Sequence, residues 1–190
     1  PLTGLVPDAD YSYRIEAGGW MSRAYPFRTA PAKGEGRVRF AFAGDSRQGV
    51  GGGAKAFMGV DALILERELH QAWIKGAAFW IQGGDLINGY TTDVDDFRAQ
   101  LRAFKWAASS FLHERPIYAG VGNHDALIRS FERRSPESGS DESIDLDRWP
   151  YESESSEAIF ADEFVHPENG PEAADPRRPE YRETVYSFQP

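Results

Sequence analysis

Three stretches of the chain place a glycine and an oxygen-bearing side chain directly after a short apolar segment. Asp45 follows residues 37–43, Asp85 follows residues 78–82 and Asn123 follows residues 116–121, each with a glycine just before it. If the three side chains converge, two carboxylates and an amide oxygen would repel one another unless a cation lay between them. The pattern therefore predicts a site for divalent metal, in which Asp85, from the middle segment, is placed to bridge two ions.

The elements that must position these residues can be predicted from the same sequence. Residues 78–82 run without polar alternation, which is typical of a strand buried on both faces. Apolar residues recur at three and four positions over about 60–75 and 93–113, which predicts two helices between the three strands. This order calls for right-handed crossovers and a parallel sheet. Ligands of such sheets bind at the carboxyl ends of the strands, where the three side chains are expected.

The three motifs, in this order and spacing, resemble the first three motifs of the calcineurin-like metallophosphoesterases, with the purple acid phosphatases as the nearest branch. The resemblance implies an α/β fold, the two-sheet sandwich flanked by helices, of which residues 37–190 would be the N-terminal portion. It also implies that Asp45 binds a first metal, Asp85 bridges both and Asn123 binds the second. The two ions would be divalent or trivalent, with iron, zinc and manganese as candidates. The implied reaction is hydrolysis of a phosphate ester by metal-bound hydroxide.

Four further residues take roles from the resemblance. His124 would protonate the leaving oxygen or hold the phosphate, and Asp125 would orient its ring. Arg47 stands where much of the superfamily has histidine; because a guanidinium stays protonated it cannot ligate metal, but it could clamp phosphate or bond Asp45. Asn88 stands where purple acid phosphatases have a metal-binding tyrosine, and could at most touch substrate. The structural alternative is that Asn123 and Asp125 only cap a turn.

Histidine is the main departure from the family. Later family motifs supply further imidazole ligands, including Gly-His-x-His, whereas this chain has only four histidines and no such motif. Either the chain is the front part of a longer enzyme, or it is a remnant with a defective site. A start at Pro1 and an ending at the onset of a strand favour the first interpretation. The expected partners are then a phosphate ester and the remainder of the polypeptide or a covering chain. The competing function is a non-catalytic surface or adhesion module that keeps the fold.

Residues 1–31 do not resemble the beginning of an α/β domain. Leu5, Pro7 and Tyr11 have the spacing of a tyrosine corner, in which the hydroxyl bonds to nearby backbone. Alternating residues from Tyr11, two glycines at 18–19 and a return over 24–29 predict a β-hairpin. The hairpin resembles the last two strands of a fibronectin type III-like domain, a module that precedes the catalytic domain in many purple acid phosphatases. The alternative is a hairpin native to this domain.

Charge and composition limit the remaining possibilities. The formal net charge is −9, and the segment 131–180 carries 15 Asp and Glu against 5 Arg. We therefore predict an acidic insertion at about 131–157, anchored by Trp149 and Tyr151, and no nucleic-acid binding by a basic surface. No apolar run approaches 18 residues, so no membrane span is expected. The absence of cysteine excludes disulfides and thiolate metal sites. A secreted or periplasmic location follows only from the family resemblance.

Overall fold

The fold is built around a three-stranded parallel sheet. The computed structural model describes residues 2–49, 56–132, 143–146, 148–172, 175–176 and 184–188. The sheet contains β5 (Phe40–Ala43), β8 (Phe79–Gln82) and β9 (Ile117–Ala119), and β8 lies in the middle and pairs in parallel with both neighbours. The parallel arrangement predicted for the three motif-bearing segments is confirmed. Their carboxyl ends therefore meet at one edge.

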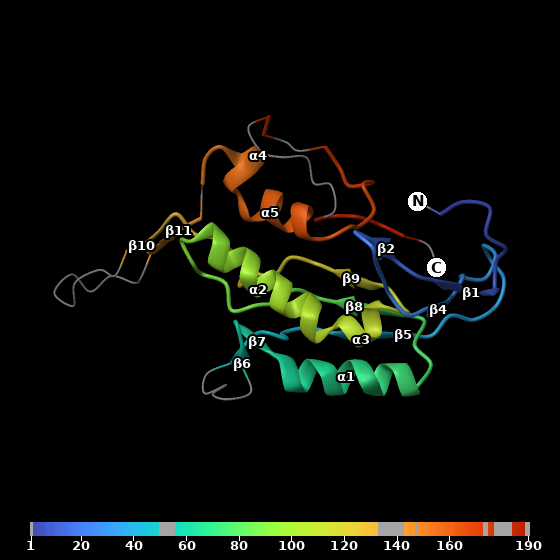
Figure 1. Cartoon of the computed structure of the whole chain (residues 1–190). Helices are drawn as coiled ribbons and strands as arrows, with labels where there is room; N and C mark the ends of the chain where they lie inside the picture. Colours follow the sequence, from blue (N-terminus) through green and yellow to red (C-terminus); the bar gives the residue numbers. More distant parts are fainter. Residues whose placement is uncertain are drawn as a thin grey trace.

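Helices connect the strands and cover one face of this sheet (Figure 1). α1 (Ala62–Ile74) lies between β5 and β8, and α2 (Val94–Ala107) and α3 (Ser109–Leu112) lie between β8 and β9. Their apolar stripes pack with Trp80 and Ala119 of the sheet in one core, which also buries Leu65, Leu69, Phe97, Leu101 and Phe104. The helix predicted over 93–113 is interrupted at Ala108. Its ψ angle of −2° departs from the α-helical value and separates α2 from α3.

The opposite face of the sheet is only partly covered in the described part of the chain. Phe40 and Phe42 of β5 are 54% and 68% exposed, whereas the ring of Phe188 stacks on Tyr118 of β9 at 4.0 Å. The other described sheets each contain two strands, among them β6 (Ala56–Phe57) with β7 (Val60–Asp61). This mixed α/β architecture with small sheets is consistent with a partial form of the predicted sandwich.

The predicted N-terminal hairpin is present. β1 (Asp10–Tyr13) pairs with β4 (Tyr25–Arg28), and the turn between them contains β2 (Glu16–Ala17) and β3 (Trp20–Met21). The hydroxyl of Tyr11 accepts a hydrogen bond from the backbone N–H of Val6 at 2.8 Å, the local bond that the tyrosine-corner spacing predicts. The hairpin docks on the end of α3, because Tyr25 stacks on the His113 ring at 4.2 Å. Its origin in a fibronectin type III-like domain stays a prediction.

The acidic segment is partly structured at its two ends. β10 (Ser130–Glu132) pairs with β11 (Ser143–Asp145), while residues 133–142 and 147 lie outside the described residues. α4 (Tyr151–Glu154) and α5 (Ser156–Glu163) follow, on the side of α2 away from α1 (Figure 1). Of the two predicted anchors, Tyr151 is buried, whereas Trp149 is 43% exposed. Glu163 binds three cationic side chains of α2, namely Arg98, Arg102 and Lys105.

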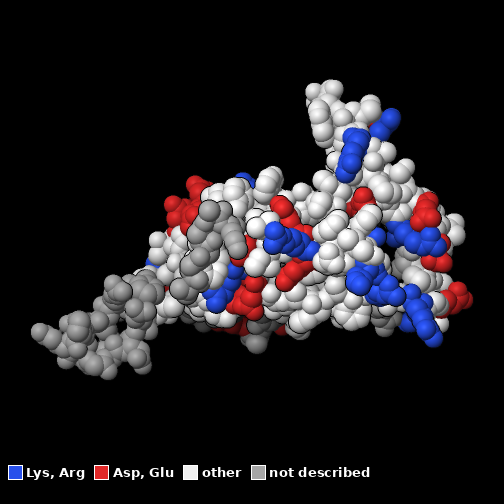
Figure 2. All heavy atoms as spheres, turned by 90° about the horizontal axis from the view of Figure 1, so that it is seen from below, with Lys and Arg blue, Asp and Glu red and all other residues white. Residues whose placement is uncertain are grey.

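Charges of both signs share the surface on the α1 side of the molecule. Figure 2 shows acidic and basic side chains interspersed over this face rather than gathered into one continuous basic area. None of the described helices is long and apolar enough to cross a bilayer.

Candidate functional site

Asp45 and Asp85 share an unusual backbone conformation just beyond the ends of β5 and β8. Their φ angles are 54° and 52°, in the left-handed region that few residues other than glycine adopt and that Asp tolerates better than most. The N–H of Asp45 donates to the carbonyl of Gly84 at 3.2 Å, and the carbonyl of Asp85 accepts from the N–H of Arg47 at 3.0 Å. The two strand ends are thus bonded together beyond the sheet, and each turns in the same way.

The carboxylates of the two aspartates converge on one guanidinium. Nε of Arg47 lies 3.7 Å from Oδ1 of Asp45 and 3.4 Å from Oδ2 of Asp85. The two carboxylate oxygens therefore lie no farther apart than the sum of these distances. The Asp85 side chain is 14% exposed and that of Asp45 is 71% exposed, so Asp85 forms the inner part of the site.

Two glycines allow the third loop to reach this pair. Oδ1 of Asp85 accepts a hydrogen bond from the backbone N–H of His124 at 2.9 Å. A Cβ added at Gly122 would lie 2.2 Å from the Asp85 nitrogen, and one added at Gly84 would lie 2.7 Å from the Gly122 nitrogen. No side chain fits at either position, because the loops after β8 and β9 touch through their backbones. This contact explains why a glycine precedes both functional residues.

Asp125 ties these two loops together. Its Oδ1 accepts from the N–H groups of Leu86 and Ile87 at 2.8 and 3.2 Å, and its Oδ2 accepts from the N–H of Gly122 at 2.8 Å. The residue is 2% exposed, and burial raises its pKa to about 6, with the charge of Asp85 adding to the increase and the three N–H bonds opposing it. The prediction that Asp125 orients the His124 ring is wrong, because its oxygens bind backbone amides instead.

The ring of His124 is oriented by another group. Its Nδ1 lies 3.0 Å from the backbone carbonyl of Asn88. Since a carbonyl only accepts hydrogen bonds, this contact makes Nδ1 the donor and leaves Nε2 for another partner. The predicted substrate-binding residue Asn88 thus contributes its backbone here, and its side chain is exposed.

Tyr90 is a residue of the site that the sequence did not assign. Its hydroxyl accepts a hydrogen bond from Nδ2 of Asn123 at 3.1 Å, and its ring lies 4.6 Å from that of His124. Donation by Nδ2 leaves the amide oxygen of Asn123 as the group that could ligate a cation. The sequence carries only a weak signal for it. The family pattern has a tyrosine at the position of Asn88, and Tyr90 lies two residues after that position.

The oxygen donors fit one hard cation better than two. Among the residues that the structure describes, no three Asp, Glu or His side chains form a group that could hold a metal. Asp45 and Asp85 offer charged oxygens of the kind that a hard divalent cation prefers, whereas the Asn123 side chain is bonded to the Tyr90 hydroxyl. Arg47 already supplies positive charge between the two carboxylates and would have to move aside for such an ion.

Comparisons with known proteins give one similarity. No family model matches the chain, and no curated protein matches it. Among solved structures, the chain is similar to the purple acid phosphatase PPD1 isolated from yellow lupin (Lupinus luteus) seeds, with 17% sequence identity and a TM-score of 0.47 over 66% of this chain. The chain spans only 22% of that protein. A likeness this low does not assign a function to the chain.

Proposed function

We propose that the protein containing this chain hydrolyses phosphate esters with the help of bound metal, and that Asp45, Asp85 and Asn123 supply oxygen ligands. One observation carries the proposal: two aspartates from adjacent parallel strands adopt the same left-handed backbone and converge on one cationic group. Holding two carboxylates together costs electrostatic free energy, and left-handed residues that are not glycine concentrate at functional sites. Both costs are explained if the edge binds a cation.

The residues around the metal position have separate tasks. Bound divalent metal supplies Lewis-acid polarisation of a phosphoryl oxygen and a nucleophile at neutral pH. Arg47 offers a planar fork of donors that suits a phosphate, provided that it leaves the two carboxylates. His124, with Nδ1 fixed on the Asn88 carbonyl, presents Nε2 to hold or give a proton at the leaving oxygen. Asp125 fixes the distance between the two loops that carry these groups.

Arg47 also favours a second candidate function. A guanidinium within ion-pair distance of both carboxylates neutralises the site without any metal. A chain of this kind could keep the fold as a non-catalytic surface module. The two candidates differ in what they require: hydrolysis needs metal bound at Asp85, whereas the module does not.

Metal binding by the purified chain tests the proposal. Equilibrium dialysis against Mn²⁺, followed by metal analysis, should find one ion bound per chain. Asp85→Asn removes one carboxylate charge with little change of shape, so the affinity should fall by at least about tenfold. Glu66→Gln is the matched control, because it makes the same charge change at an exposed residue of α1 that has no assigned role in the site. Equal binding by wild type and Asp85→Asn would refute the ligand assignment.

Turnover separates the chain from a complete enzyme. The three oxygen donors cannot fix two ions at catalytic spacing without further ligands, so the 190-residue chain alone should not hydrolyse 4-nitrophenyl phosphate in the presence of Mn²⁺ or Zn²⁺. Turnover by the purified monomer would show that our account of the missing imidazoles is wrong. Absence of Mn²⁺ binding by the wild-type chain would support the non-catalytic module, which needs no metal at Asp85.

A further inference from the structure

A cavity of about 970 Å³ lies at the other end of the central sheet from the two aspartates. Its walls include Arg39, Ala78 and Pro116, which directly precede β5, β8 and β9 respectively. Residues of the β1–β4 hairpin complete this part of the wall. The candidate metal site lies beyond the opposite ends of these strands. The cavity is therefore a separate feature, and its chemistry has to be argued on its own.

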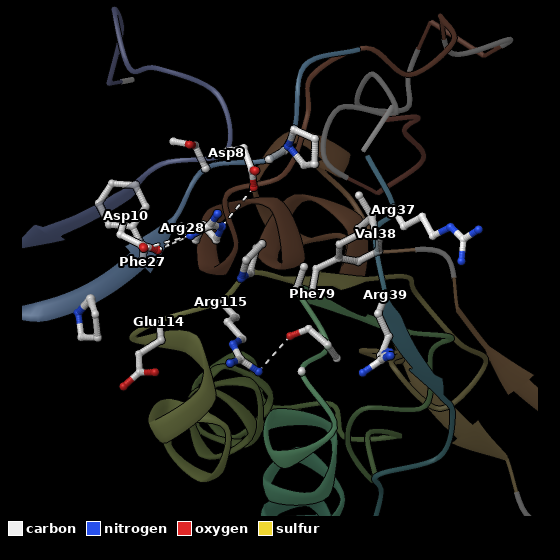
Figure 3. Close-up of a pocket in the computed structure, with 18 of the residues that line it drawn as sticks. Asp8, Asp10, Phe27, Arg28, Arg37, Val38, Arg39, Phe79, Glu114 and Arg115 are labelled. Carbon is white, nitrogen blue, oxygen red and sulfur yellow. Dashed lines mark hydrogen bonds and ion pairs between the residues drawn. The ribbon is translucent and has the colours of Figure 1, made fainter. Parts of the chain in front are cut away.

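Two arginines of this cavity are held in place by neutral groups. Nη1 of Arg115 donates to the carbonyls of Trp73 and Ala77 at 3.1 and 2.9 Å, and Nη1 of Arg39 donates to the carbonyl of Lys75. Trp73 lies in the last turn of α1, and Lys75 and Ala77 follow directly after this helix. Carbonyls fix the direction of a guanidinium but carry no full charge. Within the described part of the chain, no carboxylate forms an ion pair with Arg39 or Arg115, which lie beside the cavity (Figure 3), and the Arg115 guanidinium lies over the Trp73 ring at 5.3 Å.

The acidic residues of the cavity wall are engaged elsewhere. Asp8 and Asp10 both pair with Arg28, at 3.0 and 2.9 Å, as the dashed lines in Figure 3 show. Oε2 of Glu114 accepts a hydrogen bond from the indole N–H of Trp73 at 3.0 Å. Burial lowers the pKa of Arg115, and the charge of Glu114 offsets this only in part. A guanidinium in this position gains from a further anion beside it.

Much of the remaining wall is apolar. Phe79 and Val38 lie between the arginines in Figure 3, and Phe27 and Phe188 also line the cavity. Small-molecule sites are mostly apolar cavities of about 300–1,000 Å³ with a few polar groups that fix the orientation of the ligand. Inorganic phosphate alone would leave most of this space unfilled.

We propose that the cavity binds a small organic oxyanion, with its phosphate or carboxylate head on Arg39 and Arg115 and its apolar body along Phe79 and Val38. The fork of each guanidinium has donors left after its bonds to these carbonyls, and these donors match two oxygens of one head group. The site does not depend on the metal or on the reaction proposed above.

Calorimetry with phenylphosphonate tests the proposal, because this phosphonate is not a phosphate ester and cannot be hydrolysed as one. The titration is made on the purified chain in EDTA, which removes metal from the other site. Phenylphosphonate should bind more tightly than inorganic phosphate, which lacks an apolar group. It should also bind more tightly than benzyl alcohol, which lacks a charge. Benzoate in place of phenylphosphonate shows whether a carboxylate head is also accepted.

Three variants locate the binding. Arg39→Gln keeps a donor for the Lys75 carbonyl but removes the charge, so phenylphosphonate affinity should fall by about tenfold or more. Arg67→Gln makes the same charge change on an exposed residue of α1 outside the cavity and should leave the affinity unchanged. Asp85→Asn should also leave it unchanged. Circular dichroism checks folding, and Arg39→Lys, which keeps the charge but loses the fork, should bind more weakly if Arg39→Gln does not fold.

Several results would overturn this assignment. Absence of phenylphosphonate binding to the wild type would refute it directly. Equal losses in Arg39→Gln and Arg67→Gln would mean that overall charge attracts the anion. Tighter binding by Asp85→Asn, which lacks a carboxylate beside Arg47, would place the anion at the other edge of the sheet. Equal affinities for phosphate and phenylphosphonate would refute the role of the apolar wall.

Discussion

Asp125→Asn is expected to change how the free energy of unfolding depends on pH. The pKa of Asp125 is raised from 3.8 to about 6 in the folded chain, mainly by burial. Between these values the unfolded chain has released a proton that the folded chain keeps, so the contribution of Asp125 to stability falls as the pH rises through this window. At 1.36 kcal/mol per pKa unit, the full decrease amounts to about 3 kcal/mol, of which about 2 kcal/mol falls between pH 4 and pH 7.

The substitution also removes a hydrogen-bond acceptor. Asp125 accepts from Leu86 and Ile87 with one oxygen and from Gly122 with the other. Asparagine has a single acceptor oxygen, so at least one buried N–H faces an NH₂ group at a cost of roughly 1–3 kcal/mol. At pH 4 only this cost applies, and the variant should be less stable than the wild type by that amount. At pH 7 the burial cost of the charged carboxylate is gone, and the variant should equal or exceed the wild type.

Urea denaturation of both proteins at pH 4, 5, 6 and 7 measures this effect. The informative quantity is the difference between the two free energies of unfolding, because His166 titrates in the same range with the opposite sign. Burial lowers the pKa of His166 to about 4, so its contribution is lost as the pH falls below 6.5. A difference between variant and wild type that stays constant over the four pH values would show that Asp125 does not titrate in this window, and would refute the reasoning.

Three further outcomes are expected. Although burial alone raises the pKa of Glu163, its bonds to three cations lower it to about 2. Glu163→Gln should therefore lower the free energy of unfolding by roughly 2 kcal/mol at pH 7 and by much less at pH 3. Urea denaturation measures this, and equal losses at the two pH values would contradict it. Gly89→Ala should lower the melting temperature far more than Gly18→Ala, because both glycines have a φ of 56° but only at Gly89 would a Cβ meet backbone, at 1.6 Å from the His124 carbonyl oxygen; similar decreases would contradict the close contact. His166→Phe should lose less stability than the wild type between pH 6.5 and pH 4, and parallel pH curves would argue against a neutral buried imidazole.

Much of the sheet could be predicted because its local and long-range signals agree. An apolar run that stops at glycine and aspartate marks both the end of a strand and a turn, and this occurs at Asp45 and Asp85. The helical periodicity between these runs leaves a parallel crossover as the simple solution. The convergence of the two aspartates follows from that topology, and the structure has it.

The contacts inside the site could not be predicted in the same way. Asp125 adjoins His124 in sequence, which suggested a partnership of their side chains, but its oxygens bind amides of Leu86 and Ile87 that lie almost 40 residues earlier. Such a bond depends on how two loops meet in space, and no periodicity encodes it. The break between α2 and α3 at Ala108 was missed for a related reason, since the apolar pattern continues through it.

The position of Arg47 has a consequence for the order in which the protein is assembled. In a metal site built only of acidic side chains, the carboxylates repel one another until the ion arrives, which lowers the stability of the empty fold. Here a side chain of the protein already stands between Asp45 and Asp85. The chain can fold before it binds metal. Metal binding is then an exchange, in which the incoming ion displaces the guanidinium of Arg47 from the two carboxylates. In the proposed enzyme, the displaced group would stay beside the site, free to meet the substrate that the ion attracts.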